Sequence, residues 1–321
     1  MTSGAWPQSP RRAFNALPLV PLVLVGGGLL VIAVVFGGFV DRWLRTETVK
    51  PFFANGPIHL TATGEILVAR QDLTAAPWVG SIDAYDPVGR TTRPVLTDLR
   101  QPVTADESPD GTICAIVGGQ EQPGRASIVS CSSGLVVDLD GASGAEGTTT
   151  SLSDIVSDGS GGWIVADTGR RALLHLDAGG NVDPMIKFRQ TSALTTLPEA
   201  LARDGDRLYV AVGRSGVATV GVADRNLTDD GSRTTVIAAQ GSVQAVSALR
   251  SSALIILGER RDGGIVTYPV GVAMDPPRLV EGLFDPHGLL VLPDGRIAVA
   301  DSTRLLLVRP ATALSTPAPG G

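Results

Sequence analysis

Short runs of apolar residues, each bounded by glycine, proline or aspartate, follow one another through residues 55–310 of this chain. Such runs, separated by residues that favour turns, are typical of short β-strands. No segment in this range has the spacing of an amphipathic helix. The pattern therefore predicts an all-β domain.

The runs repeat in groups. Residues 285–308 contain an apolar strand, an Asp-Gly turn, a second strand that ends in Ala-Asp, and a third strand, and residues 151–180 align with them. Weaker copies of this order begin at four further positions: Gly56, Arg100, Leu197 and Val243. Dividing residues 55–310 among six units gives about 43 residues each, close to the four-stranded blade of a propeller repeat. We therefore predict a six-bladed β-propeller.

The last unit supplies only three strand patterns before Pro310, so a fourth strand must come from elsewhere. Residues 46–56 resemble the outer strand of the third unit. We expect Val49–Phe53 to form the outermost strand of the last blade and to join the first residues of the domain to the last. Residues 311–321 are small, proline-rich and uncharged, and we expect them to be disordered.

An apolar run without a charged residue extends from Leu17 to Val40. As a helix it would reach roughly 36 Å, enough to cross a hydrocarbon core of about 30 Å. We predict a single transmembrane helix at 17–40, after a short cytoplasmic N-terminus (1–16) and before a juxtamembrane segment (41–54). A cleaved signal peptide is the alternative, but its apolar core is usually about 7–15 residues and it ends in a small-residue cleavage site that we do not find here.

Arginines flank both ends of this run and do not decide its orientation. Cys114 and Cys131 fall in neighbouring predicted strands of the second unit, where a hairpin centred near residue 122 would place them opposite each other. We predict a disulfide between them, with two buried thiols as the alternative. Because disulfides persist in oxidising compartments, we expect a single-pass protein of the cell membrane with its large domain outside the cytoplasm.

Residues 286–301 carry the spacing P-x-G, D-G and V-A-D, which resembles the NHL-type repeat, and residues 163–180 resemble it as well. The likeness covers most of residues 55–310 and is weakest in the fifth unit. The chain thus resembles the NHL-repeat and gluconolactonase-like propeller superfamily, which includes scaffolds, streptogramin-lyase-like enzymes and lactonases. The resemblance implies a fold and no particular activity.

In propellers of this kind the first side chains of each innermost strand converge on the central channel. Alignment of the units places His287, Glu199 and Ser153 at one such position, and His59, Thr104, Asp154 and Gln244 at the next. His287, Glu199, His59 and Asp154 are the candidates for cation binding or acid–base chemistry at the channel mouth. A solvated channel lining is the simpler interpretation.

Lactonases of the superfamily bind calcium through a glutamate and several asparagine or aspartate ligands. The four asparagines of this chain fall before the apolar run or in predicted turns, so we predict no metal and no cofactor. The formal net charge of −6 and the absence of a basic cluster exclude nucleic acid as a partner.

We favour a binding or scaffolding module anchored in the membrane, with a protein partner such as the other subunits of a membrane complex. A lactonase- or lyase-like enzyme is the alternative. A sensor whose channel takes a small molecule and acts through another chain is a third interpretation.

Overall fold

The computed structural model describes residues 46–49, 56–72, 78–118, 126–140, 150–187, 197–212, 217–222, 235–237, 243–249, 252–257, 263–269, 278–283, 286–301 and 304–309. All of them belong to one compact unit, Arg45–Gly321. The predicted membrane helix at 17–40, the segment before it and the tail 311–321 lie outside the described residues. Among the described residues, no helix has the length and apolar character needed to cross a membrane.

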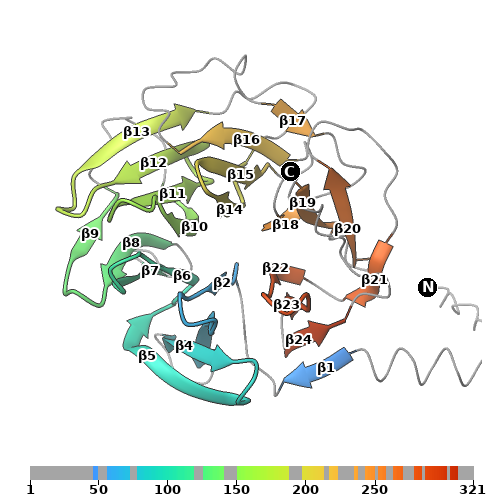
Figure 1. The fold of residues 1–321 in the computed structure, drawn as a ribbon. Coiled ribbons are helices and arrows are strands. Elements are labelled where there is room, and N and C mark those ends of the chain that lie inside the picture. The colour runs from blue at the N-terminus through green and yellow to red at the C-terminus, as the bar shows by residue number, and fades with distance from the viewer. Residues whose placement is uncertain are drawn as a thin grey trace, which may run out of the picture. The chain divides into compact units, whose positions relative to one another are not determined.

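The strands of the described residues form six antiparallel four-stranded sheets. Five sheets are consecutive in sequence (β2–β5, β6–β9, β10–β13, β14–β17 and β18–β21), and the sixth combines β22–β24 with β1. Figure 1 shows the sheets arranged around a central axis, with β2, β6, β10, β14, β18 and β22 nearest to it. The prediction of an all-β propeller is confirmed.

The bounds of the first three consecutive sheets are His59–Leu60, Ile66–Asp72, Val79–Asp86 and Thr91–Arg100 (β2–β5); Thr104–Glu107, Ile113–Gly118, Ala126–Cys131 and Val136–Asp138 (β6–β9); and Leu152–Ser157, Trp163–Asp167, Ala172–Leu176 and Val182–Lys187 (β10–β13). The bounds of the other sheets are Ala200–Asp204, Arg207–Ala211, Val217–Gly221 and Thr235–Ile237 (β14–β17); Val243–Leu249, Ser252–Leu257, Gly263–Pro269 and Arg278–Leu283 (β18–β21); and Pro286–Val291, Ile297–Asp301 and Arg304–Val308 (β22–β24), with Thr46–Val49 as β1.

The sixth sheet is completed by the start of the domain. β1 pairs antiparallel with β24, with Thr46 opposite Val308 and Val49 opposite Leu305 (Figure 1). A closing strand ahead of residue 56 was therefore predicted correctly, but the pairing begins at Thr46 and not at Val49 as expected. Residues 50–53 of the expected strand lie outside the described residues.

Apolar side chains fill the spaces between neighbouring sheets. Along β11, Val165 packs toward the β6–β9 sheet, whereas the residues on either side of it, Ile164 and Ala166, pack toward the β14–β17 sheet. Such strands bury both faces, which is why β11 reads as an uninterrupted apolar run. Trp163 and Tyr209 are among the largest fully buried side chains.

The Ala-Asp ends of the repeat close a turn onto the next strand. Asp167 at the end of β11 is fully buried, and its Oδ1 accepts hydrogen bonds from the backbone N–H groups of Ser151 (3.0 Å) and Arg170 (3.1 Å). Asp301 at the end of β23 accepts a hydrogen bond from Arg304 Nη2 at 3.0 Å. In both units the buried aspartate therefore contacts the arginine three residues later. The turns differ, because the next strand is paired from Ala172 in one unit and from Arg304 in the other.

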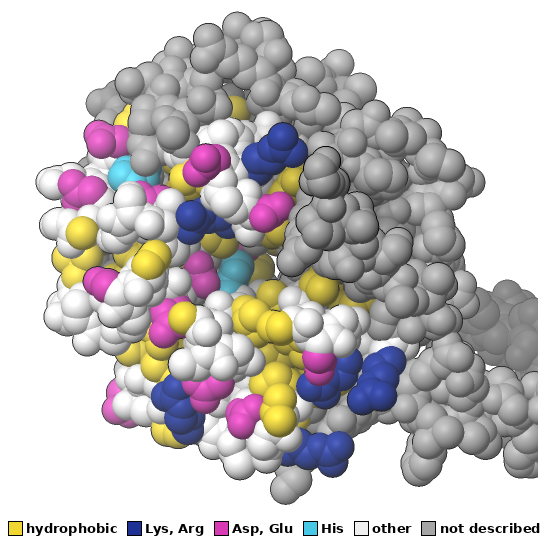
Figure 2. All heavy atoms as spheres, viewed as in Figure 1, with side chains coloured by type: hydrophobic (Ala, Val, Ile, Leu, Met, Phe, Trp, Pro, Cys, Tyr) yellow, Lys and Arg dark blue, Asp and Glu magenta, His cyan; other side chains and the backbone are white. Residues whose placement is uncertain are grey.

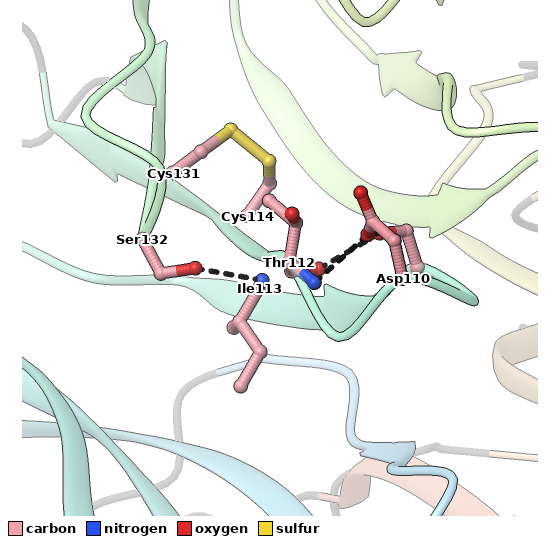
Figure 3. The surroundings of a disulfide bond; sticks show 7 residues. Asp110, Thr112, Ile113, Cys114, Cys131 and Ser132 are labelled. Atoms are coloured by element: carbon pink, nitrogen blue, oxygen red, sulfur yellow. Dashed lines mark hydrogen bonds between the residues drawn. A yellow bond between two sulfur atoms is a disulfide. The ribbon is translucent and has the colours of Figure 1, made fainter.

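The predicted disulfide is present. Cys114 in β7 and Cys131 in β8 are directly opposed, with their Cα atoms 4.0 Å apart (Figure 3). Both side chains are buried. Next to them, Ser132 Oγ accepts the Ile113 N–H at 3.0 Å, which continues the pairing of β7 with β8 beyond the bridge (Figure 3).

Candidate functional site

Side chains of the inner strands accept hydrogen bonds from backbone N–H groups of the next inner strand. Three such bonds are seen in the described residues: Ser157 N–H to Asp106 Oδ2 at 2.7 Å, Leu201 N–H to Asp154 Oδ2 at 2.6 Å, and Val291 N–H to Ser247 Oγ at 3.2 Å. The innermost strand of a blade has one unpaired edge, whose polar groups need partners when they are buried. These side chains supply the partners and connect successive blades.

Asp154 has the largest number of these contacts. Its carboxylate is completely buried, and Oδ1 lies 2.8 Å from His59 Nε2, 3.4 Å from Thr104 Oγ1 and 2.8 Å from the backbone N of Ile155. Together with the bond from Leu201, the carboxylate contacts four inner strands: β2, β6, β10 and β14. Asp154 therefore joins four consecutive blades at the axis.

His59 forms an ion pair with Asp154 close to the channel. Burial lowers the pKa of His59, but the charge and hydrogen bond of Asp154 and the charge of Asp106 outweigh it and raise that pKa to about 9. The ring is therefore an imidazolium at neutral pH and donates to Asp154 through Nε2. An imidazolium is already protonated, so it does not act as a general base at this pH.

A cavity of about 480 Å³ lies over the later residues of the inner strands. Residues from all six innermost strands line it, among them His59, Asp106, Ser157, Leu201, Ser247 and Leu289. Figure 2 shows a hollow in the middle of this face, with histidine and acidic side chains exposed within it. The size lies within the usual range for small-molecule sites, about 300–1,000 Å³.

Asp106 is a cavity residue that the sequence analysis missed. Burial raises its pKa, although the charge of His59 and the backbone N–H groups of Ser157 and Glu107 act in the opposite direction. The residue stands two positions after Thr104 on β6, and residues two apart on a strand share a face. That spacing is the signal that would have identified it.

Two predicted candidates, Glu199 and His287, do not line this cavity. They lie near the beginnings of β14 and β22, whereas the cavity lies over the later parts of the inner strands. Burial raises the pKa of Glu199 to about 7. Within the described residues, no group of three or more His, Cys, Asp or Glu side chains is placed to hold a metal ion.

The strand register corrects the predicted alignment of Gln244. Ser153, Gln244 and His287 are each the extra residue of a β-bulge in an innermost strand, at Leu152/Asp154, Val243/Ala245 and Pro286/Gly288. Gln244 therefore corresponds to Ser153 and His287 and not, as expected, to Asp154. A bulge adds one residue to a strand without any mark in the sequence, which displaced the alignment by one position.

A second histidine–aspartate pair lies away from the axis. His175 Nε2 on β12 is 2.8 Å from Asp158 Oδ2, and Asp158 also accepts hydrogen bonds from Ser160 and from the N–H of Gly162. Burial by itself raises the pKa of Asp158, but the hydrogen bonds together have the larger effect and lower that pKa to about 2. The pair therefore fixes the turn between β10 and β11.

Comparisons with known proteins support the fold. No protein-family model and no curated protein matches the chain. Among solved structures, a gluconolactonase from Xanthomonas campestris matches with a TM-score of 0.56, 14% identity and coverage of 82% of this chain and 88% of that one. A streptogramin B lyase matches with a TM-score of 0.53, 10% identity and coverage of 83% and 98%.

A protein from Thermus thermophilus described as a putative glucose dehydrogenase matches with a TM-score of 0.55, 14% identity and coverage of 82% and 99%. The chain therefore has the propeller fold of gluconolactonase-like and streptogramin-lyase-like proteins, as its repeat predicted. At these identities the likeness concerns the fold alone.

Proposed function

We propose that this protein is a membrane-anchored, extracytoplasmic β-propeller that acts as a binding module, with a small-molecule site in its channel and a protein partner on its surface. The observation that carries the proposal is the cavity of about 480 Å³, which receives residues from all six inner strands. A site built on the inner edges of a closed ring is rigid, because every wall belongs to a sheet that packs against two others.

The chemistry of His59 and Asp154 favours binding over catalysis in this cavity. His59 carries its proton at neutral pH, and both oxygens of Asp154 already accept hydrogen bonds. Neither group is available to remove a proton from a substrate. The pair instead remains a buried, hydrogen-bonded ion pair beside the cavity.

Two observations support the compartment and the anchor. The buried bridge between Cys114 and Cys131 is of the kind that persists outside the cytoplasm. The uncharged apolar run at 17–40 has the length of a transmembrane helix. The propeller follows it in the sequence after only a short segment.

The anchor is tested by washing membranes that contain the full chain with alkaline carbonate. The full chain is expected to stay in the membrane pellet, and a variant that lacks residues 17–40 is expected to be released. Release of the full chain would refute anchoring.

The protein partner is tested by purification of the full chain in mild detergent through a tag at its C-terminus. A stoichiometric partner protein is expected to copurify. Repeated recovery of the chain alone would count against the scaffolding role.

A lactonase- or lyase-like enzyme is the second candidate, and Glu199 is the observation that favours it. A carboxyl group with a pKa of about 7 is suited to proton transfer at neutral pH. The solved neighbours include a gluconolactonase and a streptogramin B lyase. Such an enzyme would use Glu199, with His287 as the second candidate near the beginnings of the inner strands. Lactone hydrolysis that is lost in Glu199→Gln and kept in Asp106→Asn would establish it.

A further inference from the structure

The channel cavity and the start of β1 lie on the same face of the ring. Across the sixth sheet, the strand register aligns four residues in one row: Val291, Ile297, Val308 and Thr46. Val291 lines the cavity, and Thr46 is the first residue of β1. The row therefore runs from the cavity wall to the first strand of the domain, and we call this side of the ring the cavity face.

The first sheet contributes the turn between β4 and β5 to the cavity face. Leu60, Ile66 and Tyr85 form the matching row in this sheet, and Leu60 lines the cavity. Arg296 of the β22–β23 turn donates a hydrogen bond from Nη2 to the carbonyl oxygen of Pro87 at 3.1 Å. The β4–β5 turn and the β22–β23 turn are therefore direct neighbours.

The β4–β5 turn presents an apolar side chain to solvent. Val88 is 82% exposed, the highest value among the large apolar side chains of the described residues. The turn is ordered by two hydrogen bonds, from the Val88 N–H to Asp86 Oδ1 at 2.8 Å and from the Arg90 N–H to the carbonyl oxygen of Asp86 at 2.9 Å. Val88 is thus held in a fixed, exposed position.

Arginines lie around this turn. Arg90 is exposed in the same turn, Arg296 belongs to the neighbouring turn, and Arg309 is exposed directly after the end of β24. The acidic residues of the two turns are Asp86 and Asp294, and Asp294 Oδ2 pairs with Arg296 Nε at 2.6 Å. Three arginines against two aspartates leave an excess of positive charge at this corner of the cavity face.

The described turns on the other blades of the cavity face carry more acids than bases. Their charged residues are Glu107, Asp110, Asp158, Asp177, Asp204 and Asp206, with Arg203 and Arg207. Between the two regions, Glu65 of the β2–β3 turn is paired with Arg93. In Figure 2, dark blue side chains gather at the lower right of this face, whereas acidic side chains are spread over its left part. An anionic surface would therefore meet the least repulsion at the corner that carries Val88.

The length of chain before β1 limits how far the domain can move from the apolar run. This run ends at Val40, and β1 begins six positions later at Thr46. Six residues reach at most roughly 22 Å, even when fully extended. With residues 17–40 in the membrane, as proposed above, the connection reaches the propeller on its cavity face.

We propose that the cavity face is turned toward the bilayer and that its corner at Val88, Arg90, Arg296 and Arg309 rests on an anionic phospholipid surface. The arginines bind lipid phosphate groups, and Val88 enters the interface between headgroups and acyl chains. The acidic blades are repelled by the same surface, so the ring is tilted and its cavity is reached from the side of the lipid. This assignment rests on the proposed membrane anchor and adds the surface through which the anchored domain contacts lipid.

The test places a fluorescent label at either end of β4 in the full chain, reconstituted in liposomes of phosphatidylcholine and phosphatidylglycerol. Val88→Cys and Val79→Cys are the matched variants, because both valines are exposed and one lies just beyond each end of the strand's buried part. The labels are attached without reductant, so that the disulfide stays intact. A lipid with a nitroxide on its headgroup is the quencher.

The label at position 88 is expected to be quenched at least about threefold more strongly than the label at position 79, since the eight residues of β4 separate the two by roughly 25 Å. Equal quenching, stronger quenching at position 79, or no quenching at either position would overturn the proposed orientation. The carbonate wash tests the anchor separately. If the full chain stays in the pellet and position 88 is not quenched, the anchor stands and the orientation falls. If the full chain is released, both fall.

The two ends of β24 test the contribution of charge. Arg309→Gln removes an arginine on the cavity face, and Arg304→Gln, the matched control, removes one at the opposite end of the strand. One positive charge near an anionic membrane surface strengthens binding by about fivefold. Arg309→Gln is therefore expected to reduce the quenching at position 88, and Arg304→Gln is expected to leave it unchanged. The same quenching in Arg309→Gln as in the unaltered chain would refute the contact with anionic lipid.

Discussion

Replacing Asp154 by alanine should remove the contact that joins four inner strands. The carboxylate is fully buried, pairs with His59 at 2.8 Å and accepts the Leu201 N–H at 2.6 Å. Its loss leaves a buried imidazolium without its counter-charge and a backbone N–H without an acceptor. Removing one partner of a buried ion pair costs about 3–5 kcal/mol, which already includes the unpaired charge that remains.

We therefore expect Asp154→Ala to lower the free energy of unfolding by about 3–5 kcal/mol, a large part of the 5–15 kcal/mol that is typical of a folded domain. For a domain of this size, this corresponds to a fall in the melting temperature of about 10 °C. Denaturant titration and calorimetry of the purified chain measure both quantities. Asp294→Asn, which changes an exposed carboxylate of a turn, is the control and should shift stability by less than about 0.5 kcal/mol.

The double variant His59→Gln/Asp154→Asn separates pairing from packing. If the ion pair is the source of the loss, removing both charges together should cost less than the sum of the two single changes, because neither variant partner is then left charged and alone. Additive losses, or a loss below 1 kcal/mol in Asp154→Ala, would refute the reasoning and assign the stability to packing alone.

Three further predictions follow from the same structure. Replacing Cys114 and Cys131 by serine should lower stability by about 3 kcal/mol on the chain-entropy model, and reductant should destabilise the unaltered chain but not this variant. Because the pKa of His59 is raised to about 9, its charge stabilises the folded state fully below about pH 6.5, and this stabilisation is lost as the pH rises through about 9. The free energy of unfolding, followed by the denaturation midpoint, should fall over that interval by about 3 kcal/mol, and by less in His59→Gln. The lowered pKa of Asp158 acts in the opposite sense, because its stabilisation is present above about pH 4 and is lost as the pH falls toward 2; Asp158→Asn should be less stable at pH 6 and less sensitive to acid.

Strand patterns, the repeat and the disulfide could be predicted from the sequence because each depends on residues close together in the chain. The Asp-Gly pairs at 110–111, 158–159 and 294–295 are residues that favour turns, and their glycines have positive φ angles of 84°, 81° and 80°. Cys114 and Cys131 were placed opposite each other by counting through one hairpin.

The candidate site was predicted only in part, because it is assembled from different blades. His59 and Asp154 were both named as candidates, but their hydrogen bond joins residues 95 positions apart and no local pattern marks it. Bulges shifted the alignment at Gln244, and the prediction placed the candidates where the inner strands begin, whereas the cavity lies over their later residues. Asp106 was missed because the sequence analysis considered only two successive positions near the start of each inner strand, and Asp106 lies further along β6.

The pairing of β1 with β24 also sets the order in which the domain can be completed during synthesis. β1 emerges from the ribosome before the other strands of the propeller, yet its partner β24 is the last of them to be made. Until then β1 has no neighbour on the edge that it will share with β24, and the hydrophobic layer between the first and last blades stays open to water. Since pairings between distant segments form slowly, a nascent chain of this kind should depend on chaperones most at the end of translation. Truncation by only a few residues within β24 should therefore do more damage than a cut of the same length in an outer loop.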